Sequence, residues 1–514
     1  MNPDGISYLD MGRAAAAGHW AETLNGYWSP LYPWIIGAAI RVVRLPTYWD
    51  FTLAHAVNFA IFIVALLGFE FLLRALRPDD QQYSSPRWLN SLFPYAAFGW
   101  TMLVWIGLAK ISPDLAVAAI VFIASGFAAR IVSERAGVFD YIGLGTALGL
   151  GYLAKGAMLP LALAFIVPVW AVGRRRARGA TIVIVAFTVV ALPFIMALSA
   201  KLDRLTAGDV AKLNYAWFVS GVKIYKHWRG DPPGTGTPAH PTRKIADEPP
   251  AYEFNGPIGG TYPVWYDPAY WHEGMQVPIK PAAQIKQLIA GVQELPWMFV
   301  DLFVAAVALL VLLLRGHITF PRHFALVLGT PLLLALSMYT AVHVEPRFLG
   351  GFVGVGLTGA FLLLQARNRG GREAAVAVFV AVGALLSARM VQATGEDVGT
   401  ILQQAEAGPL SHTQWLRARE LKRAGIQSGE RVAFIGDSFR AYWAYLGRYR
   451  IVAESPALRF WSSPSRARAR TLHAFARRGV TTVVADARYG CALDNEWTYI
   501  PQAQLCVLIM KPKR

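Results

Sequence analysis

The sequence predicts an α-helical membrane protein with many spans, and three observations carry this prediction. Of its 514 residues, 55% are hydrophobic, and the mean hydropathy is +0.38. Only 16% are charged, against roughly 25% in a soluble globular protein. Apolar runs of about 20 residues, long enough to cross a bilayer as a helix, recur through most of the chain. This composition excludes a disordered chain, a collagen and a secreted disulfide scaffold.

The apolar runs predict about ten spans. Eight are single runs, and the stretch 139–173 is long enough for two short spans with a break near Lys155. Residues 31–45 are amphipathic and carry Arg41 and Arg44, so we expect this segment to lie on the membrane surface. The eight single runs are 50–76, 88–108, 114–131, 180–200, 291–315, 323–344, 347–366 and 373–391.

The net charge of +17 first suggests a nucleic-acid partner, but the placement of the basic residues points elsewhere. One set of short loops is rich in Arg, whereas the alternate loops hold only Lys110, Lys155 and Arg347. Because cytoplasmic loops carry an excess of Lys and Arg, we place the Arg-rich set inside the cell and predict no nucleic-acid partner. This set comprises Arg74, Arg77, Arg87, Arg130, Arg135, Arg174, Arg175, Arg176, Arg178, Arg315, Arg322, Arg367, Arg369 and Arg372.

This orientation sets the predicted organisation of a multi-pass protein of the inner (plasma) membrane. The N-terminus falls outside with no apolar run before it, so either it is translocated unaided or the native chain begins with a further span. We favour the further span, which would make about eleven. The predicted parts are an external segment 1–49, spans in 50–200, an external loop or lid 201–290, spans in 291–391 and an external domain 392–514.

The two large external parts differ in character. Loop 201–290 is rich in Pro, Gly, Tyr and Trp, which favours either an ordered lid over a site or a set of interfacial anchors. Residues 430–511 contain "RVAFIGD", "RYRIVAE", "VTTVVADA" and "QLCVLIM", which predict strands, with helices around 438–447 and 463–479. This pattern predicts a small α/β domain. Cys491 and Cys506 both fall in it, as a disulfide or as two part-buried thiols.

The motif "FIGDSF" in this domain resembles the nucleophile block of GDS-type esterases, but the chain offers no suitable base after it. We therefore expect Asp437 or Ser438 to cap a helix. His272, Glu273 and Asp267 lie close together in the loop, but no Cys or His cluster has zinc spacing. We predict no metal ligands and no certain cofactor, and a divalent metal stays an open alternative.

Polar residues near the outer span ends are the candidate site. Asp4 is either a helix cap or a general base just outside the bilayer. The others are either interfacial charges that reach water or parts of a site for an anionic headgroup such as a lipid phosphate, because they all approach the same membrane face. They are Lys110 and Asp114 in "AKISPDLAV", Lys155 after "GLGYLA", and His343, Glu345 and Arg347 in "VHVEPRFLGG".

These motifs together resemble the C-type glycosyltransferase superfamily of integral membrane enzymes. They are an outer "PDGISYL", an amphipathic segment with "YWSPLYPW", a Ser-Pro-Asp at the start of a span, a Lys between two spans and "EPRFLGG". In appearance the nearest groups are bacterial relatives of protein O-mannosyltransferases and the lipid A aminoarabinose transferase. The resemblance implies transfer of a sugar from a polyprenyl-phosphate donor, commonly with inversion, to a lipid, glycan or protein acceptor.

The resemblance also implies roles for particular residues. The family's key carboxylate would be Asp4, with Tyr8 as the aromatic that follows it. Its phosphate contacts would map to Lys155 and Arg347, with Lys110 less secure. Family members often carry a second acidic residue beside the first, where this chain has Gly5. This departure leaves the acceptor chemistry and any metal dependence open.

Two other functions remain as alternatives. A transporter or flippase of lipid-linked anions would usually show internal repeats and polar residues near the bilayer midplane, whereas the polar residues here gather at span ends. A non-catalytic membrane scaffold related to glycosyltransferases is the second alternative, because of Gly5 and the missing first span. Membrane lipids are expected partners in every case.

Overall fold

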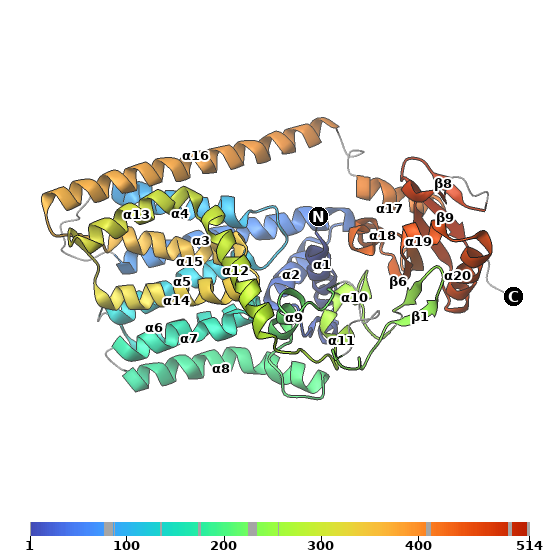
Figure 1. The fold of residues 1–514 in the computed structure, drawn as a ribbon, viewed down its shortest axis with the longest axis horizontal. Coiled ribbons are helices and arrows are strands. Elements are labelled where there is room, and N and C mark those ends of the chain that lie inside the picture. The colour runs from blue at the N-terminus through green and yellow to red at the C-terminus, as the bar shows by residue number, and fades with distance from the viewer. Residues whose placement is uncertain are drawn as a thin grey trace.

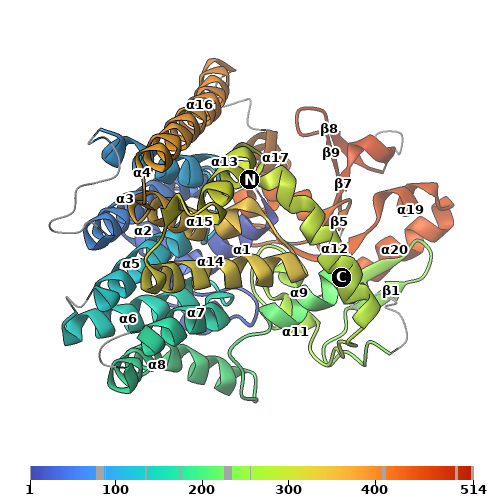
Figure 2. The same cartoon turned by 60° about the vertical axis from the view of Figure 1, so that its left-hand side comes forward.

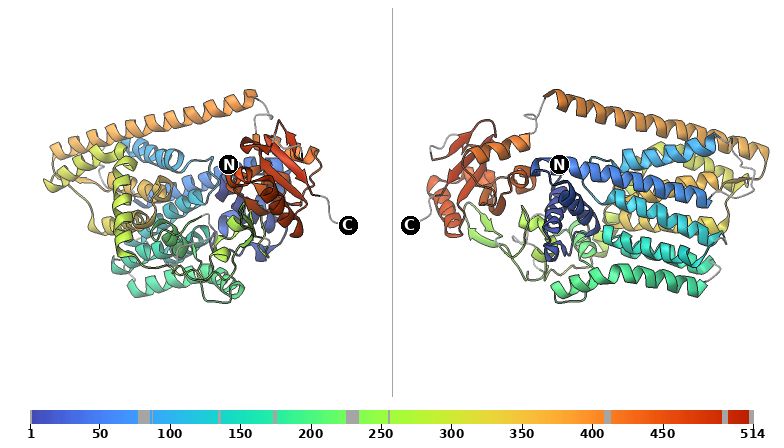
Figure 3. Two further views of the ribbon diagram at one scale, coloured as in Figure 1. Left: turned by 45° about the vertical axis from the view of Figure 1, so that its right-hand side comes forward. Right: turned by 180° about the vertical axis from the view of Figure 1, so that it is seen from behind.

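The computed structural model describes residues 2–76, 86, 88–133, 136–172, 176–224, 234–254, 256–407, 413–491 and 496–510. Along its long axis the molecule has three parts (Figure 1): a bundle of long helices at one end, an α/β domain at the other, and short helices and loops between them. The view from behind in Figure 3 shows the same order. The protein is therefore mostly helical, as the sequence predicts, and the described residues contain one seven-stranded sheet and a pair of two-residue strands, β3 (Ile318–Thr319) and β4 (Gln365–Ala366).

The helical bundle matches most of the predicted apolar runs. The stretch 139–173 is divided as expected, because α6 ends at Ala154 and α7 begins at Met158. In Figures 1 and 2, α16 runs along the outside of the bundle. The bundle helices are α3 (Asp50–Leu76), α4 (Leu89–Gly99) with the π-helical η3 (Trp100–Ile106), α5 (Asp114–Val132), α6 (Val138–Ala154), α7 (Met158–Val172), α8 (Arg176–Lys201), α12 (Pro281–Met298), α13 (Val300–Leu314), α14 (Arg322–Val342), α15 (Pro346–Leu362) and α16 (Arg369–Ala407).

One predicted span is wrong in shape. The run 291–315 is not a single straight helix, because α12 and α13 meet at Phe299 with a bend of 89°. Pro296 lies in the last turn of α12, where its ring removes a backbone hydrogen bond and favours a break. Helix α12 also begins at Pro281, inside the predicted loop 201–290, and α16 continues to Ala407, beyond the predicted boundary at 391.

The number of spans stays a prediction. Among the described residues, five helices are long and apolar enough to cross a membrane, or six if α12 and α13 count as one broken span. Helices α6, α7 and α15 are apolar but shorter. Of the predicted cytoplasmic arginines, Arg74 and Arg130 lie in the last turns of α3 and α5. Outside the described residues lie Arg77, Arg87, Arg135, Arg174 and Arg175.

The loop 201–290 contains more regular structure than expected, and part of it joins the C-terminal domain. The seven-stranded sheet has the order β1-β2-β6-β5-β7-β9-β8, with β5 parallel to β6 and β7 and the other pairs antiparallel. The first two strands of this order come from the loop. The elements of the loop are α9 (Val210–Phe218), β1 (Arg243–Ala246), β2 (Ala251–Glu253), α10 (Pro263–Tyr266) and α11 (Pro268–Trp271).

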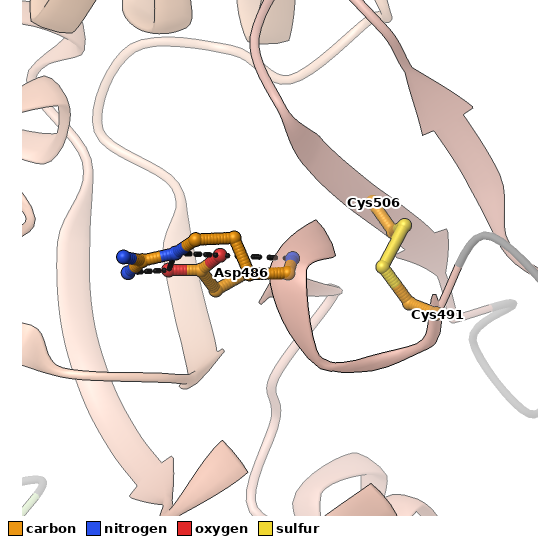
Figure 4. The surroundings of a disulfide bond; sticks show 4 residues. Asp486, Cys491 and Cys506 are labelled. Atoms are coloured by element: carbon orange, nitrogen blue, oxygen red, sulfur yellow. Dashed lines mark hydrogen bonds and ion pairs between the residues drawn. A yellow bond between two sulfur atoms is a disulfide. The ribbon is translucent and has the colours of Figure 1, made fainter. Parts of the chain in front are cut away.

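The four strands predicted in the C-terminal domain are present, and the sequence missed the short β8. Cys491 and Cys506 form a disulfide bond that ties the segment after β7 to β9 (Figure 4). Asp437 caps the short helix η5 (Ser438–Arg440), as predicted, by accepting from Phe439 N at 3.1 Å. The domain holds α17 (Thr413–Arg423), β5 (Arg431–Ile435), α18 (Tyr442–Gly447), β6 (Arg450–Ser455), α19 (Ala457–Ser462), α20 (Ser465–Arg477), β7 (Thr482–Asp486), η6 (Ala487–Tyr489), β8 (Thr498–Ile500) and β9 (Leu505–Ile509).

Helices α1 (Pro3–Ala16) and α2 (Leu31–Val43) occupy the middle layer and pack tightly against each other. A side chain at Gly37 would meet Gly12 O at 2.6 Å, so the crossing requires glycine there. The C-terminal domain docks on this layer through Tyr445, whose hydroxyl donates to Asp50 Oδ2 at 2.6 Å. Arg13 joins the same contact, with its Nη2 at 2.5 Å from Asp50 Oδ2. These buried polar contacts fix the domain over the end of the bundle.

Candidate active site

The sequence-predicted site residues gather at the end of the bundle that faces the middle layer. Asp114 begins α5, and Arg347 lies in the first turn of α15. Lys155 lies in the gap between α6 and α7, and Lys110 lies in the loop before α5. Helix ends place these charged side chains at one level because the apolar bodies of the helices leave them no other place in the bundle.

Asp114 is the centre of the cluster. Its side chain is 2% exposed and binds two cations, with Lys155 Nζ at 2.7 Å from Oδ1 and Arg347 Nη1 at 3.2 Å from Oδ2. The Ser112 hydroxyl also donates to Oδ2 at 3.0 Å. A buried carboxylate needs such partners to offset its desolvation. Asp114 therefore fixes the positions of Lys155 and Arg347.

Glu345 is the second anion of the cluster. Its carboxylate accepts from Arg347 Nε at 2.6 Å and lies 3.0 Å from His343 Nε2. Lys110 Nζ approaches the same carboxylate at 3.8 Å. Although burial raises the pKa of Glu345, the hydrogen bonds from His343 and Arg347 lower it below its usual range. Glu345 is therefore ionised, and it holds Arg347 from the side opposite Asp114.

Aromatic rings surround the two most buried cations. The ammonium of Lys155 lies 3.7 Å from the centre of the Phe348 ring and 5.7 Å from that of Tyr339. The Arg347 guanidinium lies 4.8 Å from the Phe348 ring. His343 stacks on Phe218 with ring centres 4.2 Å apart. Such contacts hold cations in a water-poor place without neutralising their charge.

Asp4 reaches the same cluster from the middle layer. It lies in the first turn of α1, after Pro3 and with Asn2 at the cap position, so it is not the helix cap. Burial raises the pKa of Asp4 above its usual range. The charge of Arg347, the polar side chain of Trp265 and the charge of Lys110 act in the opposite direction. Asp4 is thus a half-buried carboxyl group close to the cations and to an indole from the loop 201–290.

Tyr8 lies one turn after Asp4 in α1 and lines the wall of the site. Its ring packs edge-on against Trp28 at 5.2 Å and Tyr32 at 5.4 Å. Trp28 in turn donates its indole N–H to Trp265 O at 3.1 Å. Tyr8 therefore belongs to an aromatic layer that supports Asp4 and Trp265.

The structure thus brings all eight predicted site residues to one place, although they come from four separate segments of the chain. Trp265 and Ser112 are the neighbours that sequence reasoning did not single out. Trp265 was visible only as one of many aromatics in "GTYPVWYDPAYWHEG", and Ser112 only as part of "SPD". Neither motif indicates which of its side chains points toward the site.

The loop residues considered as metal ligands have other partners. Asp267 caps α11 by accepting from Tyr270 N at 3.3 Å, and His272 Nδ1 lies 2.9 Å from Pro268 O. Glu273 lies 2.7 Å from His240 Nε2. Among the described residues, no group of three or more His, Cys, Asp or Glu side chains is placed to hold a metal ion. With Glu345 and Asp114 both occupied by cations, the cluster does not fit a metal, and no step below uses one.

Comparisons with known proteins agree with this architecture. No protein-family model and no curated protein matches the sequence. Two crystal structures of ArnT from Cupriavidus metallidurans match the fold at 12% identity: the apo form with a TM-score of 0.52 and the form bound to undecaprenyl phosphate with 0.54. They cover 100% and 99% of this chain and 94% and 93% of theirs. The Archaeoglobus fulgidus oligosaccharyltransferase matches with a TM-score of 0.45 and 11% identity, over 95% of this chain and 64% of that one.

ArnT is a lipid A aminoarabinose transferase and, like the oligosaccharyltransferase, a C-type glycosyltransferase. At this level of identity the likeness to ArnT concerns the fold, and it extends over nearly the whole of both chains. The chain therefore has the fold of ArnT.

Proposed function

We propose that this protein is a membrane glycosyltransferase that transfers a sugar from a polyprenyl-phosphate carrier to an acceptor, with Asp4 as the general base. The observation that carries the proposal is the half-buried carboxyl group of Asp4 beside the cations Lys110, Lys155 and Arg347, at one end of a bundle with the ArnT fold. A base beside cations is what transfer from a lipid phosphate requires.

The three cations supply the donor site in this proposal. Lys110, Lys155 and Arg347 outnumber their carboxylate partners Asp114 and Glu345. The planar guanidinium of Arg347 suits a phosphate group, and the two ammonium groups add charge. The cluster lies at the end of an apolar bundle, where a lipid chain could run along the helices while its phosphate reaches the cations. ArnT with bound undecaprenyl phosphate supports a carrier of this class.

The proposed reaction is a single displacement at the anomeric carbon. Asp4 accepts the proton of the acceptor hydroxyl, whose oxygen forms a bond to C1 of the sugar. The bond between C1 and the phosphate oxygen breaks, and the polyprenyl phosphate leaves with its electron pair, stabilised by Lys155 and Arg347. Attack from the side opposite the phosphate inverts the anomeric configuration. The raised pKa of Asp4 makes it a stronger base than an exposed aspartate.

Asp114 and Glu345 have a different role in this proposal. Asp114 already binds Lys155, Arg347 and Ser112, so it positions the cations and does not act as the base. Glu345 holds Arg347 and lies near Lys110 in the same way. We further propose that this end of the bundle and the α/β domain lie on the extracytoplasmic side of the inner membrane, as the Arg-rich loops at the other end predict.

The test is the variant Asp4→Asn, which has the same size but cannot accept the proton. The full-length protein in detergent or nanodiscs is given a panel of polyprenyl-phosphate sugars and candidate acceptors, and products are identified by mass. We expect transfer to fall roughly 10²- to 10⁴-fold, the usual contribution of a general base. The control is Asp247→Asn, an exposed carboxylate paired with Lys244, which should transfer like the wild type.

Two outcomes would overturn the proposal. Undiminished transfer by a folded Asp4→Asn protein would remove Asp4 from the role of base. Uptake of a lipid-linked anion into proteoliposomes, without any glycosyl product from the whole panel, would point to a transporter instead.

A further inference from the structure

An open cleft of about 650 Å³ lies at the opposite end of α1 from Asp4. We call it the α1–α2 cleft. Arg13 of α1, Arg41 and Arg44 at the end of α2, and Arg448 after α18 all line it. Asp4 and Arg13 are nine residues apart in one helix, which corresponds to roughly 14 Å along its axis. The cleft is therefore separate from the cluster around Asp114.

The cleft carries positive charge that the protein does not neutralise. Arg13 is paired with Asp50, but none of Arg41, Arg44 and Arg448 makes an ion pair with a carboxylate in the described part of the chain. They contact neutral oxygens instead, with Arg41 Nη1 donating to a backbone carbonyl at 3.0 Å and Arg448 Nε to a threonine hydroxyl at 3.1 Å. Three guanidinium groups around one cleft attract an anion, and their planar forks match a phosphate.

The carboxylates that line the cleft do not cancel this charge. Asp10 is half-buried and accepts both the backbone N–H and the hydroxyl of Thr261, at 2.8 and 3.0 Å. Burial raises the pKa of Asp10 to about 7, so this carboxyl group is partly protonated near neutral pH. Glu22 lies 3.5 Å from His19. The arginines thus remain the dominant charges of the cleft.

An apolar rim adjoins these arginines. Val42 is 81% exposed, and Val43, Leu45 and Trp49 are also exposed. All four lie within five residues of Arg44 in the sequence. The rim lies where the apolar bundle meets the middle layer, because α3 begins at Asp50, directly after Trp49 (Figure 1). Exposed apolar side chains beside unpaired arginines are typical of a segment at the surface of a membrane.

We propose that the α1–α2 cleft binds the phosphate headgroup of an anionic membrane lipid. The phosphate oxygens accept hydrogen bonds from Arg41, Arg44 and Arg448, and the acyl chains lie against Val42 and Leu45. Because α1 and α2 line the cleft on one side and Arg448 of the α/β domain lines it on the other, the lipid joins the middle layer to the domain. This proposal concerns binding alone and does not depend on sugar transfer by Asp4.

The test is the binding of short-chain lipids to the purified full-length protein in detergent, followed by native mass spectrometry and tryptophan fluorescence. Dihexanoyl phosphatidylglycerol is the anionic probe, dihexanoyl phosphatidylcholine has the same chains without net charge, and inorganic phosphate is the free anion. We expect saturable binding of phosphatidylglycerol and weaker binding of the other two. The double variant Arg41→Gln/Arg44→Gln should weaken phosphatidylglycerol binding roughly 30-fold.

The matched control is Arg315→Gln/Arg322→Gln, which removes the same charge from exposed positions at the other end of the bundle. This control should bind like the wild type. Equal affinity for the two lipids, equal affinity for free phosphate, or unchanged binding by the Arg41/Arg44 variant would each overturn the proposal. If that variant elutes as an aggregate, Arg448→Gln tests the same cleft from the domain side, and unchanged binding by it is equally decisive.

Discussion

The strongest stability prediction concerns the buried pair of Asp114 and Lys155. Asp114→Asn keeps the size of the side chain but removes its charge, which leaves the ammonium of Lys155 without the carboxylate that now lies 2.7 Å away. Removing one partner of a buried ion pair costs about 3–5 kcal/mol. Because Arg347 keeps Glu345 as a partner, at 2.6 Å, the lower end of about 3 kcal/mol applies.

A double-mutant cycle measures this interaction directly. Lys155→Met removes the cation and keeps an unbranched apolar chain of similar length. In the protein with both changes, neither side chain leaves a buried charge without its partner, so the combined loss should be smaller than the sum by about 2 kcal/mol. The free energy of unfolding in detergent micelles, followed by a cysteine-labelling or steric-trapping assay, gives the four values of the cycle.

The control cycle uses Asp301 and Arg389, whose carboxylate and guanidinium lie 3.0 Å apart with the arginine 45% exposed. An exposed pair contributes about 0–1 kcal/mol, so its cycle should be nearly additive. If the Asp114–Lys155 cycle were also additive, the ion pair at the centre of the cluster would be refuted. The positioning role of Asp114 would then fall with it.

Three further predictions concern Asp10, the disulfide bond and the orientation of the protein in the membrane. Because the pKa of Asp10 is raised to about 7 in the folded protein, this group contributes stability that is full below pH ~4 and is lost as the pH rises through about 7. The difference in thermal unfolding temperature between pH 5 and pH 8 should therefore be smaller for Asp10→Asn than for the wild type. An equal difference in the two proteins would refute this. The double change Cys491→Ala/Cys506→Ala should cost the domain about 3 kcal/mol, seen as faster proteolysis of folded protein, and unchanged proteolysis would contradict it. A cysteine at Ile279, which is 82% exposed, should react with an impermeant reagent in intact cells, whereas one at Arg369 should react only after permeabilisation; the reverse pattern would overturn the proposed orientation.

The sequence predicted the parts of the site that follow from the cost of charge in a membrane. Lys110, Lys155 and Arg347 stood out because they broke the pattern of the loops, and the structure brings them together. A charged side chain between apolar runs must lie at the end of a span. Charged side chains at the same end of neighbouring spans must lie close to one another, so the clustering of these three residues was predictable.

The pairing within the cluster could not be predicted in the same way. Asp114 is four residues from Lys110, yet it pairs with Lys155 and Arg347, which lie 41 and 233 residues away. Which cation meets which anion depends on the rotation of each helix about its axis. That rotation is set by packing over the whole bundle, and single motifs carry no signal for it.

The bend between α12 and α13 and the long-range pairing of strands could not be predicted from the sequence either. The run 291–315 is equally apolar whether it is straight or bent, so the turn at Phe299 has no compositional sign beyond Pro296. Strands β1 and β2 are short and lie in a loop rich in Pro and Gly. Their place in the sheet depends on the pairing of β2 with β6, in which Tyr252 lies opposite Glu454, 202 residues later in the chain.

The sheet that joins these distant segments also sets the order in which the protein can be assembled. Ser455 of β6 donates to Pro250 O, 205 residues earlier, at 2.8 Å, so β2 leaves the ribosome long before its partner strand exists. At a synthesis rate of about 5–20 residues per second, the β1–β2 hairpin waits roughly 10–40 s with an open edge. Thr261, which holds Asp10, also accepts from Ile451 N at 2.9 Å. The wall of the middle layer therefore closes only when the last part of the chain has been made, and a nascent chain cut short before β6 cannot complete it.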